Sequence, residues 1–156
     1  MFPELRWKLA QRNGIKLRSE RLQKEFNTLE ELKSMYNLLE PRSIKGSNQV
    51  SAFFDAYYGG MEVLRVEEDF YDLAMTYFER AALMNVRYSE IFFDPQAHTR
   101  RGVSLEALMR GLRRAQLEAE QRLQVSFLSF LNTYMSTNFS TGQITVDNVP
   151  APRYVT

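Results

Sequence analysis

Cysteine is absent from the 156 residues, and histidine occurs once, as His98. The absence of cysteine excludes disulfides, thiolate metal sites, iron–sulfur clusters and cysteine nucleophiles. A zinc site takes several protein ligands, usually with His or Cys in the majority, and one imidazole cannot supply them. The composition therefore predicts that this chain holds no zinc site.

An excess of charge of one sign and a long apolar run are also missing. The 20 Lys and Arg residues against 19 Asp and Glu leave a formal charge of +1, which offers no argument for a nucleic-acid partner. No apolar run approaches the roughly 20 residues of a membrane span, and the first residues lack the apolar core of a signal peptide. We therefore expect a soluble chain in the cytoplasm, and the nucleus stays open as a second compartment.

The apolar residues that are present recur at three- and four-residue spacing in the first half of the chain, which is typical of helices. This pattern predicts four helices, over residues 4–13, 28–39, 47–65 and 67–81. The third has the widest apolar face, and most of that face is aromatic. Gly59 and Gly60 lie inside it at a cost of about 1–2 kcal/mol relative to alanines, so we expect close packing or a bend at that point.

The period changes after Asn85. Residues 86–93 are rich in β-branched and aromatic types and predict a strand, which a loop over residues 96–103 follows. Ser104 then caps a further helix, and residues 125–131 predict a second strand. Strand, loop, helix and strand in this order form one βαβ unit, which implies two parallel strands.

His98 lies in the loop after the first predicted strand, close in sequence to Asp94 and Gln96. In open α/β sheets and in barrels, ligands bind at this end of the strands. A lone histidine is more often a hydrogen-bonded loop residue than a catalytic one, and both interpretations stay open here. The acidic run over residues 67–69 complements the dipole of the helix that it begins. The residues by themselves thus indicate no complete catalytic site.

Three segments together resemble a known family. VRYSEIFFDPQAHTRRGVS (residues 86–104) resembles a strand and loop of the adenosine/adenine deaminase family, in particular of its bacterial and fungal adenine deaminase branch. SAFFDAYYGGMEVLRVEEDFYDLAMTYFERA (residues 51–81) is similar to the paired helices before that strand. PELRWKLAQRNGI (residues 3–15) is similar to the family's first helix. The likeness runs in order from residue 3 to about residue 125.

This resemblance implies an α/β fold, a (β/α)8 barrel with the helical pair above the active-site mouth. The chain would cover that helix-rich lid and about one βαβ unit. The implied reaction is zinc-dependent, hydrolytic deamination of adenine or adenosine to hypoxanthine or inosine. The resemblance also implies candidates for the substrate pocket. Three match the gating helix that roofs the purine, namely Phe53, Phe54 and Tyr57. Three match the loop at the mouth of the second barrel strand, namely Asp94, Gln96 and His98. Ordinary core packing is the alternative for the aromatic residues.

The family's zinc and catalytic motifs have no counterpart in these segments. Its H-x-H pair would precede Met1, and its later zinc ligands and catalytic Glu would follow residue 131. We therefore expect no catalytic residue and no bound zinc in this chain, although the family uses zinc. A complete barrel takes about 250 residues or more, so residues 1–131 would form part of a barrel with exposed sheet edges. Residues 132–156 match nothing of the family and predict a loosely ordered tail.

Three hypotheses of function remain. The chain is a fragment or an aberrant product of a purine deaminase gene, and is inactive as it stands. Alternatively, it is a non-catalytic interaction protein whose aromatic helices, over residues 47–65 and 67–81, associate with another copy or with a full-length paralogue, since large exposed apolar patches favour association. Thirdly, it is an independent helical domain that carries the loop motif by coincidence.

Overall fold

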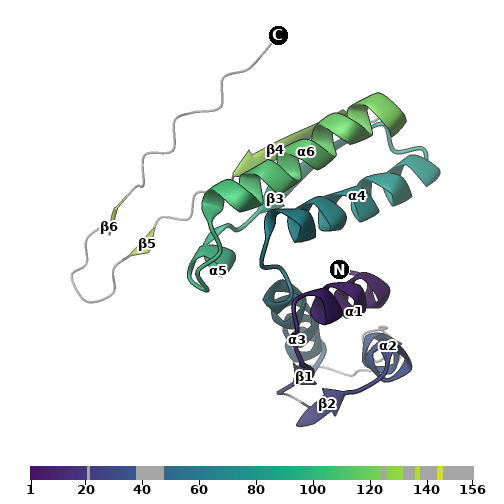
Figure 1. The fold of residues 1–156 in the computed structure, drawn as a ribbon, viewed down its shortest axis with the longest axis vertical. Coiled ribbons are helices and arrows are strands. Elements are labelled where there is room, and N and C mark those ends of the chain that lie inside the picture. Colours follow the sequence, from purple (N-terminus) through teal and green to yellow (C-terminus); the bar gives the residue numbers. More distant parts are fainter. Residues whose placement is uncertain (21, 38–47, 124–125, 132–135, 138–143, 146–156) are drawn as a thin grey trace.

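The computed structural model describes residues 1–20, 22–37, 48–123, 126–131, 136–137 and 144–145. Its elements follow one another as shown in Figure 1: α1 (Pro3–Arg12), β1 (Leu17–Ser19), β2 (Lys24–Phe26), α2 (Leu29–Asn37), α3 (Asn48–Glu62), α4 (Glu67–Leu83), β3 (Tyr88–Phe93), α5 (Gln96–Thr99), α6 (Leu105–Leu123), β4 (Ser126–Leu131), β5 (Ser136–Thr137) and β6 (Ile144–Thr145). The chain is thus a helix-rich α/β protein, as the sequence predicts.

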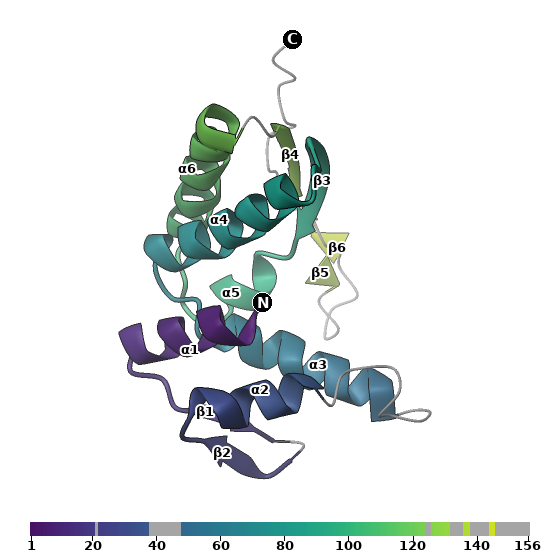
Figure 2. The same cartoon turned by 90° about the vertical axis from the view of Figure 1, so that its right-hand side faces the viewer.

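The predicted βαβ unit is confirmed. β3 and β4 pair in parallel, from Tyr88 opposite Ser126 to Phe93 opposite Leu131. Figure 2 shows α4 and α6 together on one side of this strand pair. The parallel arrangement follows because α6 crosses from the end of β3 back to the start of β4.

A stripe of small residues lets α6 approach α4 closely. Gly111, Ala115 and Ala119 are buried along one side of α6, and the two alanines pack in a cluster that includes Phe78 of α4. A Cβ added at Gly111 would overlap the backbone oxygen of Glu67. The glycine is therefore required by the distance between the two helix backbones, and not by a turn.

The first half contains a β-hairpin that the sequence analysis missed. β1 and β2 pair antiparallel with Leu17 opposite Phe26, so the prediction of helices alone before the βαβ unit is wrong in this segment. Each strand has three residues, and such a length is too short to show an alternating pattern. The charged residues at the exposed positions weaken the apolar pattern further, because only Leu17 and Phe26 are apolar.

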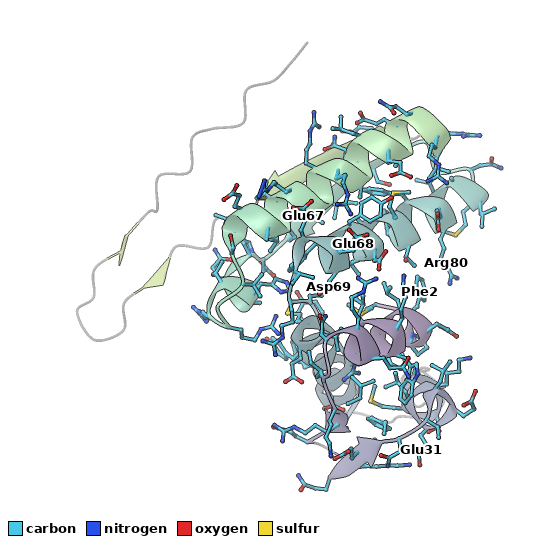
Figure 3. All side chains as sticks on the ribbon, viewed as in Figure 1. Phe2, Glu31, Glu67, Glu68, Asp69 and Arg80 are labelled. Carbon is cyan, nitrogen blue, oxygen red and sulfur yellow. The ribbon has the colours of Figure 1, made fainter. Side chains whose placement is uncertain are left out.

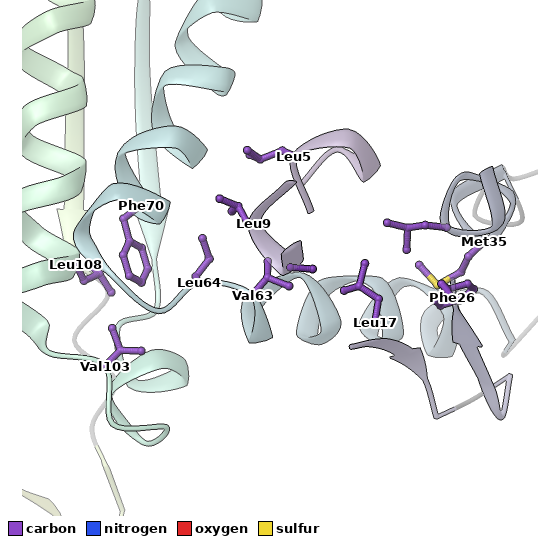
Figure 4. Packing of buried hydrophobic residues seen from close by; sticks show 12 residues of the cluster. Leu5, Leu9, Leu17, Phe26, Met35, Val63, Leu64, Phe70, Val103 and Leu108 are labelled. Carbon is purple, nitrogen blue, oxygen red and sulfur yellow. The ribbon is translucent and has the colours of Figure 1, made fainter. Parts of the chain in front are cut away.

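A continuous row of buried apolar residues joins the elements up to α3 with those from α4 onward, which are called the two halves below (Figure 4). The row runs from α6 and α4 through the α3–α4 connection to α1, the hairpin and α2, and its members are Leu108, Phe70, Val103, Leu64, Val63, Leu9, Leu5, Leu17, Phe26 and Met35. Val63 and Leu64 lie between the two halves, at 0% and 2% exposure. The two halves therefore share one core.

Most of the predicted helix ends are confirmed. α1 ends at Arg12 with Asn13 as its C-cap, and Gly14 follows with φ +62°, which is the left-handed conformation that glycine adopts at no steric cost. α2 begins after Thr28, whose Oγ1 accepts from the backbone N–H of Glu31 at 3.2 Å. The Glu31 carboxylate accepts from Asn27 N–H at 2.8 Å. The predicted helix over 28–39 is described as far as Asn37; its last two residues lie outside the described part.

The loop predicted over residues 96–103 contains a helical turn, α5 (Gln96–Thr99). The prediction of a loop throughout is therefore wrong. A helix of four residues is too short to produce a periodic pattern, so the sequence carries no signal for it.

Within the segment 132–156, the described residues form the short antiparallel pair β5–β6. The other residues of this segment lie outside the described part, and the loosely ordered tail stays a prediction. Among the helices in the described part of the chain, none combines the length and the apolar character needed to cross a membrane.

Candidate functional site

The aromatic residues of α3 and the loop after β3 meet in space. The Tyr57 hydroxyl lies 3.5 Å from Oδ2 of Asp94, across a sequence separation of 37 residues. The pKa of Tyr57 is raised, chiefly because the ring is partly withdrawn from water and further because a phenolate would face the Asp94 carboxylate. One candidate on the helix and one in the loop are therefore neighbours in the fold.

The described aromatic candidates on α3 do not lie in the core. Phe54 is 43% exposed and Tyr57 is 39% exposed. The Phe54 ring stacks on Tyr58 with centroids 5.7 Å apart, and Tyr58 meets Tyr57 edge to face at 5.4 Å. Ordinary core packing is thus not the role of Phe54 or Tyr57. The side chain of Phe53 lies outside the described part.

Asp94 is the polar centre of the loop after β3. Its Oδ1 is buried and accepts no hydrogen bond from the part of the chain that the structure describes, while Oδ2 faces Tyr57. Gln96 begins α5 next to it and is half-buried. A carboxylate oxygen with an open acceptor position can bind a donor such as an amino group or a ring N–H of a ligand.

His98 is held inside the protein by two neighbours. It is 7% exposed, its ring meets Phe70 edge to face with centroids 5.0 Å apart, and its Nδ1 lies 2.9 Å from Nη2 of Arg101. Because guanidinium only donates, Nδ1 accepts and the proton of the neutral ring is on Nε2. Burial, and secondarily the charge of Arg101, lower the pKa of His98 to about 4. His98 is thus a neutral, hydrogen-bonded residue of the α5 turn.

The side chains of the candidate site, with Asp94 and His98 as its possible metal ligands, do not fit a metal ion. Within the part of the chain that the structure describes, no three His, Asp or Glu residues come together as ligands. The one imidazole of the sequence is turned towards the Arg101 cation, and a ligating His normally has a carboxylate, carbonyl or water at its other nitrogen. No chemical step through a metal ion follows from these residues.

The start of α4 carries a buried anion that positions α1 against α4. The Asp69 carboxylate accepts from the N–H groups of Arg65 and Val66 at 2.9 and 3.0 Å, from Asn13 Nδ2 at 2.8 Å and from Arg12 Nη1 at 3.0 Å. Figure 3 shows Asp69 at the end of α4 that faces α1. The acidic run at this helix start is therefore structural, as the sequence analysis predicts, and its third member also connects two helices.

Arg6 is a buried cation that the sequence analysis missed. It is 1% exposed, and its Nε and Nη1 atoms donate no hydrogen bond to any of the described residues. The guanidinium lies against Gly59 on α3, so the expected close packing is confirmed at Gly59 but not at Gly60. The sequence carries only a weak signal for the burial of Arg6, since an arginine on an amphipathic helix is usually solvated.

Known proteins share both sequence and fold with this chain. The family model described as adenosine deaminase matches residues 1–145. An adenine deaminase from Rhodospirillum rubrum is 46% identical over 132 residues, which are 83% of this chain and 35% of that protein. The crystal structure of an adenine deaminase from Arthrobacter aurescens has a TM-score of 0.67 and 40% identity, and the match covers 83% of this chain and 35% of that one.

An amidohydrolase from Burkholderia ambifaria, whose crystal structure holds zinc, is similar with a TM-score of 0.60 at 19% identity, over 84% of this chain and 32% of that one. This last likeness concerns the fold alone. The chain spans about a third of the length of the curated relatives that it matches. Because the family model covers nearly the whole sequence and the same elements recur in the solved structures, the chain belongs to the adenosine deaminase family.

Proposed function

We propose that this chain forms the substrate-covering part of a purine deaminase fold, a partial (β/α)8 barrel in which α3 roofs a purine base or nucleoside. The observation that carries the proposal is the contact between Tyr57 and Asp94. A partly exposed aromatic residue thus lies beside a carboxylate that follows β3, and the carboxyl ends of parallel strands are where α/β proteins generally bind ligands. This supports the proposal.

The chemistry of these groups suits an aminopurine. Aromatic rings such as Phe54 and Tyr57 stack on a flat base and exclude water from it. The carboxylate of Asp94 accepts from an exocyclic amino group or a ring N–H, and its Oδ1 has no hydrogen-bond partner. Gln96 and His98 then form the turn that holds this loop in place.

The family reaction, hydrolytic removal of the 6-amino group of adenine or adenosine, is proposed as the chemistry to which this surface belongs. Zinc supplies an activated water in that chemistry, but the described residues do not fit a zinc ion. The role proposed for this chain is therefore to bind and cover the purine, without turnover by the chain alone.

Ligand-observed NMR with adenine and adenosine tests the binding part. Saturation transfer to the purine protons is expected with the unchanged chain and is expected to fall at least fivefold in Tyr57→Ala and Asp94→Asn. Tyr88→Ala is the matched control, because Tyr88 is also an exposed tyrosine but pairs with Glu90 on β3. Equal transfer in all four proteins would contradict the proposed site.

Ammonia release from adenine and adenosine, with added zinc, tests the second part. No release above the uncatalysed background is expected. Turnover that a chelator abolishes would show that the chain itself is an active enzyme, and would leave the binding measurement unaffected.

A second candidate function is non-catalytic association through α3, with another copy or with a full-length paralogue. The exposure of Phe54, Tyr57 and Tyr58 on consecutive turns of one helix favours it. Multi-angle light scattering of the chain, alone and with a full-length family member, checks this candidate. A monodisperse monomer in both samples, with a cooperative thermal transition, would exclude it.

A further inference from the structure

Asn13 and Gly14 form the one Asn-Gly pair in the sequence, at the point where α1 ends. In such a pair the backbone nitrogen of the glycine can attack Cγ of the asparagine side chain, because glycine has no Cβ to obstruct the approach. A C–N bond forms to Cγ, the bond from Cγ to Nδ2 breaks, and ammonia leaves with the proton of the glycine N–H. Solvent water then opens the cyclic imide at either carbonyl, which leaves aspartate or isoaspartate. This pair is therefore chemically prone to deamidation.

The backbone at the end of α1 keeps Asn13 away from the geometry of this reaction. The ring closes only when the Gly14 nitrogen lies on the same side of the Asn13 Cα–C bond as Cβ. With ψ of 5° at Asn13, the Gly14 nitrogen is instead almost eclipsed with the nitrogen of Asn13. The N–H groups of Asn13 and Ile15 stabilise this conformation, because they donate to Leu9 O at 3.0 Å and to Ala10 O at 2.8 Å. Ring closure therefore requires the end of α1 to open.

The side chain of Asn13 is fixed as well. Its Nδ2 donates to Val63 O at 2.8 Å and to Oδ2 of Asp69 at 2.8 Å. The Asp69 carboxylate is itself held at the start of α4 by the N–H groups of Arg65 and Val66, at 2.9 and 3.0 Å, so it cannot follow the amide. Nδ2 is the group that leaves as ammonia, and both of its bonds break before Cγ can turn towards the next backbone nitrogen. The docking of α1 on α4 therefore protects Asn13.

The product of deamidation does not fit the place that Asn13 occupies. A carboxylate there would present oxygen to Val63 O and to the Asp69 carboxylate, where the amide now presents N–H groups. The Asp69 side chain has no exposed area, and like charges in contact at a buried site disfavour each other strongly. Arg12 is already shared between Asp69 and Asp72, at 3.0 and 2.7 Å. The modified end of α1 is therefore repelled from α4.

We propose that Asn13 is a deamidation site that the docked fold protects, and that its modification makes an opening of α1 permanent. Local opening of a folded protein is ordinarily reversible, whereas chemical modification of the opened chain makes the loss irreversible. Each opening exposes Asn13 to the reaction, and a modified chain does not dock again. Purine binding at Tyr57 and Asp94 is not involved.

Peptide mass spectrometry of the full chain tests the protection. Trypsin releases residues 13–16 as one peptide, which separates into asparagine, aspartate and isoaspartate forms. During incubation at mildly alkaline pH, deamidation of Asn13 is expected to be at least about tenfold slower in the folded chain than in guanidinium chloride. Asn85, which Val86 follows, is the internal control, because the valine side chain obstructs ring closure in both conditions. Equal rates for Asn13 in the two conditions would overturn the proposal.

Two carboxylate variants connect the protection to docking. Asp69→Asn removes the charge that holds both Asn13 and Arg12, and is expected to accelerate deamidation of Asn13 at least about fivefold without denaturant. Asp72→Asn is the matched control, because it leaves both bonds of Asn13 Nδ2 in place, and is expected to change the rate by less than about twofold. Equal rates in these two variants would contradict the role of docking.

Refolding after modification tests the permanence. The chain is kept in guanidinium chloride for increasing times and then diluted, and the recovered helical circular dichroism is expected to fall in step with the modified fraction. Asn13→Asp is expected to lower Tm at least about twice as far as Asn13→Ala, which removes the same two hydrogen bonds without adding a charge. Full recovery of a modified chain, or an equal or smaller loss in Asn13→Asp than in Asn13→Ala, would overturn the proposal.

Discussion

The guanidinium of Arg6 on α1 lies so close to the backbone of Gly59 on α3 that a Cβ there would overlap its Nη2 atom. Among the described residues, the atom nearest to a Cβ added at Gly60, one residue later, is the Cβ of Met1 at 3.7 Å. The first glycine of the pair is thus required by a neighbour, and the second is not.

A double-mutant cycle tests this relationship. Gly59→Ala is expected to destabilise the unchanged chain by about 1 kcal/mol or more, because Arg6 is 1% exposed and has little room to move. In an Arg6→Leu background, the same change is expected to stabilise by about 1 kcal/mol, the usual preference for Ala over Gly in a helix. Urea unfolding of the four proteins gives the coupling free energy. Additive effects would show that Arg6 does not decide the cost.

Replacement by alanine is expected to change the free energy of unfolding in opposite directions at Gly111 and at Gly60. Gly111→Ala is expected to lower the free energy of unfolding by about 2 kcal/mol or more, because the new Cβ would meet the Glu67 backbone oxygen and lie 2.9 Å from Phe70 Cβ. Gly60→Ala is the matched control and is expected to raise it by about 1 kcal/mol. Chemical denaturation of both variants provides the measurement, and the same sign in both would contradict the packing argument.

Asp69 and Asp72 provide a comparison of a buried with a partly exposed carboxylate. Asp69→Asn is expected to cost about 3 kcal/mol or more, because its side chain has no exposed area and its charge is paired with Arg12. Asp72→Asn is expected to cost less than about 1 kcal/mol, since its partners Lys8 and Arg12 are in contact with solvent. Thermal unfolding of the two variants checks the order. Equal losses would mean that Asp69 is not the main connection between α1 and α4.

His98 predicts a pH dependence of stability below neutrality. Its pKa of about 4 in the folded chain lies below the value of 6.5 for an unperturbed histidine, so between these values the unfolded chain binds more protons. Stability is therefore complete above about pH 6.5 and falls as the pH decreases towards 4, by up to about 3 kcal/mol at 1.36 kcal/mol per pKa unit.

Since the sequence has one histidine, a single Hε1 signal in proton NMR reports its titration directly. Urea unfolding between pH 5 and 7 gives the slope, and His98→Asn is expected to remove most of it. A measured pKa near 6.5, or an unchanged slope in the variant, would contradict the buried, neutral state.

Much of the fold could be predicted because regular elements leave a period in the sequence. The apolar spacing predicted α1, α2, α3, α4 and α6, and the aromatic run after Asn85 predicted β3. The three-residue strands β1 and β2 and the single turn α5 are too short for a period to repeat, and they were missed. Tyr57 and Asp94, two of the six candidate residues, are neighbours, and the assignment of the candidates to a substrate pocket stays a prediction. The burial of Arg6 left only a weak signal, since an isolated arginine on a helix is usually solvated.

The sequence by itself determined the order and type of the long elements, and the absence of thiolate chemistry, because both depend on residue types and on spacing along the chain. The tertiary structure alone decided which distant residues meet: Tyr57 with Asp94, Asp69 with Arg12, and Arg6 with Gly59. Such contacts depend on how helices pack in space, and packing depends on the shapes of all the side chains between them.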